Sequence, residues 1–194
     1  REHILPNMQA VMGPLPDASR KVPLDVQVSE EVKTDQYIRK KLTFATEKDD
    51  RVPAYLLVPR ERKGKLPAVL CLHQTNGKHG KAEPAGLGGL ANLHYAHHLA
   101  ERGYVTLAID YPNFGEYFLD VYERGYASAS MKGVVNHRRG VDLLLAHPGI
   151  QQVAVAVHSL GGHNSLFLAA FDDRVRAAVT SCGFTAFAKY YGGN

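Results

Sequence analysis

The strongest constraint on the fold is a short stretch in the last quarter of the chain, where small and β-branched apolar residues run directly into a turn. Residues 153–157 read Val-Ala-Val-Ala-Val, and residues 158–162 read His-Ser-Leu-Gly-Gly. A short, wholly apolar run that ends in turn glycines is typical of a strand buried on both faces of a parallel sheet. Because residues 163–171 have helical character, the stretch predicts a strand, a tight turn and a helix in that order.

Ser159 lies at this turn and Gly161 follows two positions later. A serine between a buried strand and a helix, with glycine two positions on, is the pattern of a nucleophile elbow. The turn is so sharp that only a small residue fits at Gly161, and it leaves the serine hydroxyl exposed at the end of the strand. The N–H of Leu160, at the start of the helix, is then free to bind an oxyanion.

Length and composition indicate one globular domain. The chain has 194 residues, of which 45% are hydrophobic and 22% charged; these values are ordinary for a soluble domain. The net charge is +4, but the basic residues are scattered over segments 39–41, 60–65 and 138–139. Since no nucleic-acid-binding motif accompanies them, we interpret them as solvated faces and expect no nucleic-acid partner.

Membrane and targeting signals are missing from the sequence. No stretch reaches the roughly 18 apolar residues of a membrane span, and there is no apolar region of a signal peptide. The chain begins at Arg1 rather than methionine, so we expect that its native start is missing, and the sequence leaves its localisation open. Cys71 and Cys182 lie at the ends of predicted buried strands, and we expect both to be buried free thiols.

The alternation of strands and helices predicts an α/β fold with a mostly parallel, doubly wound sheet. Residues 1–36 are expected to wrap the outside of a domain formed by residues 37–194. Two strands that form an antiparallel hairpin at a sheet edge lead the domain, and Pro53 favours that edge position. The predicted strands cover residues 37–46, 51–58, 66–72, 104–109, 153–157 and 175–181, and the predicted helices cover residues 90–102, 128–146 and 163–171.

Residues 37–185 resemble the α/β-hydrolase superfamily, in the branch of dienelactone hydrolases, acetyl xylan esterases and prolyl-oligopeptidase-like proteins. The resemblance is carried by His158-Ser-Leu-Gly-Gly162, by His73-Gln-Thr75 after the third predicted strand, by Gly103-Tyr-Val105 leading to residues 110–115, and by the strand order. It implies that Ser159 is the nucleophile of an ester hydrolase that forms an acyl-enzyme. It also implies that Leu160 supplies one oxyanion N–H and that either Gln74 or Thr75 supplies the second.

The same resemblance implies a small-molecule or carbohydrate ester as substrate, with neither cofactor nor metal; it leaves the oligomeric state open. Two features depart from the family pattern. Val157 replaces the first glycine of G-x-S-x-G, and the acid and histidine of the triad would follow later strands, beyond Asn194. Of the histidines in the chain, we expect His158 to pack or hydrogen-bond beside the elbow, His163 to be directed away from the pocket mouth by the start of its helix, and His73 to orient its own loop.

The chain is therefore expected to be a C-terminally truncated fragment, with its sheet incomplete after the sixth predicted strand. Such a fragment would be inactive by itself, whereas the parent protein would be active. The exposed edge of the last strand and the uncovered apolar faces should make the isolated chain unstable or prone to aggregation.

The sequence also allows other functions. A hydrolase fold that only binds a ligand would also accommodate Val157, and a serine peptidase of the prolyl-oligopeptidase type uses the same elbow. Residues 86–91 match the dinucleotide fingerprint G-x-G-x-x-A, but residues 73–85 separate them from the preceding strand, where the fingerprint requires an immediate connection. His94, His97 and His98 share a predicted helix, for which a surface or packing role is favoured over metal binding because the H-E-x-x-H glutamate is missing.

Overall fold

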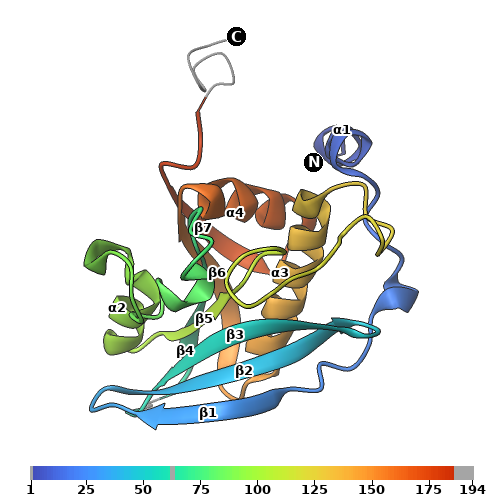
Figure 1. The fold of residues 1–194 in the computed structure, drawn as a ribbon. Coiled ribbons are helices and arrows are strands. Elements are labelled where there is room, and N and C mark those ends of the chain that lie inside the picture. Colours follow the sequence, from blue (N-terminus) through green and yellow to red (C-terminus); the bar gives the residue numbers. More distant parts are fainter. Residues whose placement is uncertain (1, 62–63, 186–194) are drawn as a thin grey trace.

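A computed structural model describes residues 2–61 and 64–185 of the chain (Figure 1). Its centre is a seven-stranded sheet in the order β1-β2-β3-β5-β4-β6-β7. The strands are β1 (Gln27–Lys33), β2 (Tyr37–Glu47), β3 (Asp50–Pro59), β4 (Leu66–Leu72), β5 (Val105–Ile109), β6 (Ile150–His158) and β7 (Val175–Ser181). The pairs among β5, β4, β6 and β7 are parallel, whereas β1, β2, β3 and β5 pair antiparallel. The predicted fold class is confirmed.

Helices cover both faces of the sheet, as a doubly wound fold requires. The helices are α1 (Ile4–Met12), α2 (Tyr95–Glu101), α3 (Ala129–Ala146) and α4 (Leu160–Phe171), and short 3₁₀ turns are η1 (Ala18–Arg20), η2 (Gly80–Ala82) and η3 (Ala91–Leu93). Helices α3 and α4 pack on one face and α2 on the other (Figure 1). No helix in the described ranges is long and apolar enough to cross a bilayer.

Strand β6 shows how the apolar pattern builds this core. Successive side chains of a strand point to opposite faces. Val153, Val155 and Val157 accordingly join the large core under α3 and α4, while Ala154 and Ala156 face the α2 side. The larger residues therefore fill the face that carries two helices, and the alanines meet a smaller layer.

The N-terminal edge differs from the prediction. The hairpin of β2 and β3 is interior, because β3 also pairs with β5 and an additional strand, β1, covers β2. Strand β1 reads Gln-Val-Ser-Glu-Glu-Val-Lys and is almost wholly exposed, so no apolar face marked it in the sequence. The edge position inferred from Pro53 is therefore wrong, and the segment before residue 37 supplies an edge strand. The domain boundary at residue 36 stays a prediction.

Two smaller expectations also fail. The helix predicted from residue 90 begins at Tyr95. The glycine-rich residues 86–89 form turns and bends, and the η3 turn occupies Ala91–Leu93 before the helix starts. Cys71 is a buried free thiol as expected, but Cys182 is exposed, because it lies just beyond the end of β7 rather than inside the sheet. After the last predicted strand the sequence predicts the start of a loop over residues 182–194, of which residues 186–194 lie outside the described residues.

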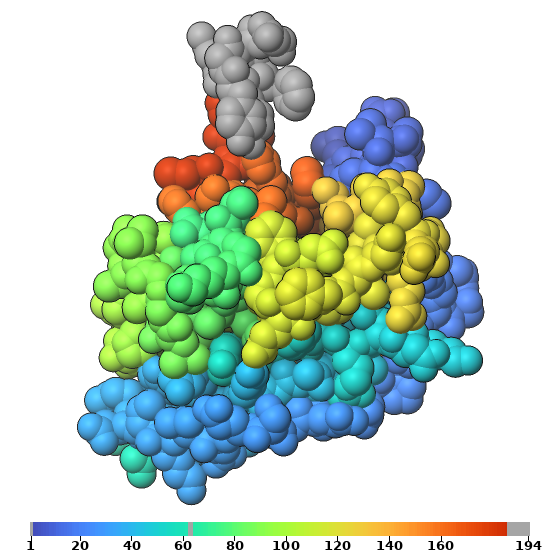
Figure 2. Space-filling view, viewed as in Figure 1, coloured from blue at the N-terminus to red at the C-terminus, as the bar shows by residue number. Residues whose placement is uncertain are grey.

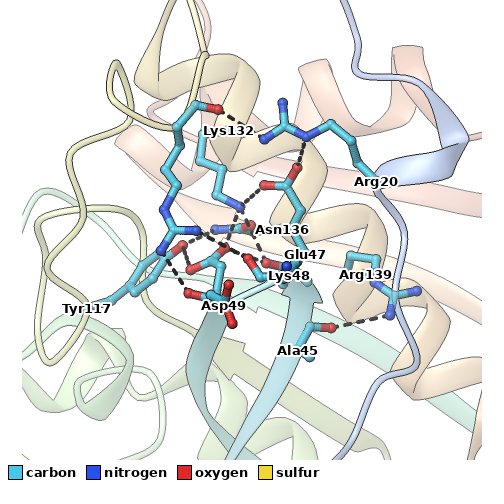
Figure 3. A network of polar contacts seen from close by, with 12 residues as sticks. Arg20, Ala45, Glu47, Lys48, Asp49, Tyr117, Lys132, Asn136 and Arg139 are labelled. Atoms are coloured by element: carbon cyan, nitrogen blue, oxygen red, sulfur yellow. Dashed lines mark hydrogen bonds and ion pairs between the residues drawn. The ribbon is translucent and has the colours of Figure 1, made fainter.

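A buried charge network fixes α3 to the β2–β3 turn (Figure 3). The Lys132 ammonium lies 2.7 Å from a Glu47 oxygen and 2.5 Å from an Asp50 oxygen, and Lys132 is fully buried. Tyr117 also donates a hydrogen bond to Asp50. Burial opposes ionisation of Asp50, but the Lys132 ammonium and these hydrogen bonds outweigh it and hold the pKa of the Asp50 carboxyl below its usual value. The network anchors the longest helix to the antiparallel part of the sheet.

Candidate active site

Ser159 occupies the turn between β6 and α4, where its backbone has φ 53° and ψ −116°. A positive φ is strained for a residue with a Cβ and is held only where surrounding contacts enforce it. Two hydrogen bonds do so: the Ser159 N–H donates to the carbonyl of Ser181 at 2.8 Å, and the Gly162 N–H donates to the carbonyl of Ser159 at 2.7 Å. The strand–serine–helix turn predicted from the sequence is therefore present.

Gly161 brings this turn onto the end of β4. A Cβ at Gly161 would lie 2.9 Å from the carbonyl carbon of Leu72 and would collide with its oxygen. It would also lie 3.1 Å from the Cβ of Val157. Only glycine allows this approach, which places the first turn of α4 beside the residues that follow Leu72.

Val157, the departure from the family pattern, is accommodated inside the sheet. It pairs with Leu72 on one side and Thr180 on the other, and its side chain belongs to the buried core. The elbow therefore forms with valine at this position.

Leu160 is the first residue of α4. The first N–H groups of a helix have no acceptor within the helix, so the Leu160 N–H points out of the helix end. Leu160, Ser159 and the residues after Leu72 follow neighbouring parallel strands and so lie at the carboxyl edge of these strands, where open α/β sheets bind their ligands.

Gln74 and Thr75 follow His73 at the exit of β4, and a buried carboxylate organises this loop. Glu83 is 1% exposed. Its oxygens accept hydrogen bonds from the side-chain amides of Gln74 at 2.9 Å and Asn76 at 3.0 Å, and from the N–H of Leu90 at 3.1 Å. Sequence reasoning missed Glu83, because an acidic residue in a glycine-rich loop is ordinary loop composition.

His73 is fully buried behind the same loop. Its Nδ1 lies 2.6 Å from the carbonyl of Gln74, and its Nε2 lies 3.4 Å from the N–H of Tyr111. A neutral ring with the proton on Nδ1 satisfies both contacts, and burial lowers the pKa of His73, which favours that neutral form. His73 therefore orients its loop, as expected.

Asp110 joins the two long loops at this edge. Its carboxylate accepts from the N–H and the ammonium of Lys81, at 2.8 and 2.7 Å, and from the N–H of Glu116 at 3.1 Å. A Cβ at Gly80 or Gly115, both at positive φ, would collide with it. The loops after β4 and β5 consequently lie side by side, as Figure 2 shows in green and yellow.

Two buried polar residues lie on the helices that cover this face, His137 on α3 and Asn164 on α4. Asn164 donates to the carbonyl of Leu160 at 2.9 Å. His137, whose ring packs edge-on against Tyr111, is fully buried, and neither of its ring nitrogens has a partner among the described residues. Burial lowers the pKa of His137 to about 3, so this ring is neutral at physiological pH.

The structure thus places Ser159 and Leu160 at the end of β4, from which Gln74 and Thr75 follow, and among the hydrogen bonds within residues 2–61 and 64–185 none joins the Ser159 hydroxyl to a histidine. His158 instead contacts the Ser181 hydroxyl at 3.2 Å. Elsewhere, on α2, His97, His98 and Glu101 lie close enough together to hold a metal ion.

Known proteins resemble this chain in sequence and in fold. No family model matches the chain. A Bacillus subtilis protein named "Putative hydrolase YtaP" is 26% identical over 185 residues, which are 89% of this chain and 60% of that protein.

Among solved structures, a "putative acetyl xylan esterase" from Bacteroides fragilis superposes with a TM-score of 0.76 at 19% identity, covering 91% of this chain and 51% of that one. Acetyl xylan esterase 1 from Thermoanaerobacterium sp. superposes with a TM-score of 0.59 at 19% identity, covering 81% of this chain and 52% of that one. This chain spans 60% of YtaP and about half of each of these esterases. The superpositions, together with the mixed seven-stranded sheet, show that it has the α/β-hydrolase fold that these esterases share.

Proposed function

We propose that this chain carries the nucleophile and the oxyanion hole of a serine carboxylic-ester hydrolase. The observation that supports this most directly is the strained backbone of Ser159, held at the turn between β6 and α4 against the exit of β4. Strain at such a turn persists where contacts enforce it and is concentrated at functional sites. Similarity to a named hydrolase and to acetyl xylan esterases supports the same reaction class.

In the proposed reaction, the Ser159 oxygen attacks the carbonyl carbon of an ester. The oxyanion that forms accepts hydrogen bonds from the Leu160 N–H and from the N–H of Gln74 or Thr75. Collapse of this intermediate expels the alcohol and leaves an acyl group on Ser159. Water then attacks the acyl-enzyme and releases the acid and the free serine.

Both steps need a base, which passes the Ser159 proton to the leaving alcohol in the first step and passes a proton from the attacking water back to Ser159 in the second. We propose that an acid and a histidine from beyond Asn194 provide it. This chain covers about half of each of the solved esterases, which is compatible with catalytic residues contributed by another part of the complete protein. The 194-residue chain alone is then inactive.

The proposed substrate is a small-molecule or carbohydrate ester. The loop after β5 begins at Asp110, which is joined to the loop after β4, and it presents two exposed aromatic rings, Phe118 and Tyr122. Exposed aromatic rings of this kind stack on sugar rings or hold an apolar group.

A fluorophosphonate probe tests the nucleophile. The complete protein that contains this chain should be labelled at Ser159, and Ser159→Ala should abolish labelling and lower kcat/KM for p-nitrophenyl acetate by roughly 10⁴-fold. Ser19→Ala, at an exposed serine of η1, is the matched control and should change neither readout.

Two outcomes would contradict the proposal. Steady-state hydrolysis by the 194-residue chain alone, lost on Ser159→Ala, would show that the base lies within it. An unlabelled Ser159 in the folded complete protein would instead favour a hydrolase fold that binds a ligand without catalysis, the alternative that Val157 also allows.

A further inference from the structure

The three histidines around α2 are arranged differently from what their spacing suggests. His94 and His98 are four residues apart, the usual separation of two metal ligands on a helix. However, His94 precedes the helix, and its Nε2 lies 2.9 Å from the carbonyl of Gly88. The ring centroids of His94 and His98 are 6.5 Å apart, whereas those of His97 and His98 are 5.0 Å apart. The rings of the adjacent residues His97 and His98 are therefore closer together than those of the two histidines that are four residues apart.

Glu101 reaches both rings of this closer pair. One of its oxygens lies 3.4 Å from Nε2 of His97 and the other lies 3.4 Å from Nδ1 of His98. One ligand atom from each of the three residues lies within 4.8 Å of the other two. Ligands around a tetrahedral zinc ion, at about 2.0–2.1 Å from the metal, are roughly 3.4 Å apart. Each carboxylate oxygen of Glu101 therefore already lies at this separation from the nitrogen of one imidazole ring.

A contact from the sheet orients one of these rings. The Tyr37 hydroxyl, on β2, lies 2.7 Å from Nδ1 of His97, and Tyr37 is only 4% exposed. Metal-binding histidines commonly use their second nitrogen in this way, and the partner fixes the ring and the tautomer. Coordination through Nε2 of His97 would select the tautomer in which Nδ1–H donates to the Tyr37 oxygen.

We propose that His97, His98 and Glu101 form a site for one divalent transition-metal ion of the zinc class, with a fourth position open to water. Two imidazole nitrogens and one carboxylate suit zinc, whereas calcium and magnesium prefer oxygen ligands alone. The three side chains are 29–47% exposed, so an ion can reach them from solvent. The site lies on α2, on the face of the sheet opposite α3 and α4.

Zinc titration by calorimetry, with cobalt absorption as a second readout of ligand geometry, tests the site in the purified protein. We expect one equivalent of Zn²⁺ to bind. His98→Ala and Glu101→Gln should each weaken binding by more than about tenfold, because each removes one of three ligands. Tyr37→Phe should weaken it by roughly tenfold, as loss of an orienting partner does.

His94→Ala is the matched control, because it removes a histidine beside the same helix that the structure leaves out of the site. Binding should be unchanged in this variant. Failure of Zn²⁺ to bind would overturn the proposal, and so would undiminished binding in both His98→Ala and Glu101→Gln. Loss of binding in His94→Ala would assign the ion to the pair suggested by the spacing instead. Since this site lies apart from Ser159, none of these outcomes depends on esterase activity.

Discussion

The two edge strands of the sheet, β1 and β7, differ in charge and in the packing around them. At the N-terminal end, β1 covers β2 with a row of charged residues, including a Glu31–Lys40 ion pair, and the buried Lys132 network joins the neighbouring strands to α3. At the other end, β7 pairs with β6 alone among the described residues, and its residues are mostly exposed. Charged residues protect an edge from pairing with another chain; β7 has an exposed apolar residue, Val179, at 61% exposure.

The open end also leaves one face of the sheet uncovered. Val179 pairs with Ala156 and Ala177 pairs with Ala154, so these four residues share the face on the α2 side. Two hollows, of about 380 and 430 Å³, lie along it. Ser159 follows β6 at this same end. We propose that, in the complete protein, further chain packs on this half of the molecule, which also carries the candidate nucleophile.

The largest expected effect is at the closed end. Lys132→Met should lower the free energy of unfolding by about 3–5 kcal/mol, because it leaves the carboxylates of Glu47 and Asp50 buried without their cation. Urea unfolding followed by circular dichroism measures this. A loss below 1 kcal/mol would show that the network does not hold this end together.

Acid should destabilise the two regions of the molecule at different pH values. The lowered pKa of Asp50 means that its contribution to folding is complete above its unfolded pKa of about 3.9 and is lost as the pH falls below that value. His137 has a folded pKa of about 3, so its neutral form contributes fully above the unfolded value of about 6.5 and the contribution falls between pH 6.5 and 3. Near pH 5 the elbow side should therefore weaken first.

The expected loss from His137 between pH 6.5 and pH 5 is about 2 kcal/mol. Unfolding free energies at pH 7 and pH 5 measure it, and hydrogen exchange locates it in α3 and α4. His137→Met keeps the site filled and should flatten this pH dependence. An equal slope in wild type and variant would mean that His137 does not titrate on unfolding.

Substitution of Val179 tests the uncovered face of the sheet on the α2 side. Val179→Lys in the 194-residue chain should alter the free energy of unfolding by less than about 0.5 kcal/mol, because the side chain is exposed, and should reduce aggregation. In the complete protein the same change should cost more, if further chain packs on this face as we propose. Light scattering and urea unfolding of both forms give the comparison. Equal costs in both would argue that the face stays open.

A similarly small effect is expected at the charged edge itself. Lys40→Met removes the partner of Glu31 in a solvent-exposed ion pair, and such pairs contribute about 0–1 kcal/mol. This variant is also the matched control for Lys132→Met, since both remove a lysine ammonium. A cost comparable with that of Lys132→Met would mean that the edge pairing, not the buried network, stabilises this end.

Much of this architecture could be predicted from local pattern. The bounds of β4 and β7 agree with the predicted strands, and Ser159 lies at the predicted turn. Strand β1 could not be found, because its exposed residues carry no periodic apolar signal. Glu83 and Lys132 were missed for a different reason: charged residues in a loop or a helix are ordinary, and only burial together with partners distant in sequence makes them structural.

The order of strands and helices, the elbow and its serine follow from residues that are close neighbours in the chain. Apolar alternation, turn glycines and helix caps act over a few residues, so the chain alone specifies these features. The exit of β4 meets the elbow, Glu83 collects its amide donors and Glu101 bridges two histidines only after distant segments have packed. Those contacts depend on which side chains burial excludes from water and on the geometry of the closed loops, and the three-dimensional fold alone determines them.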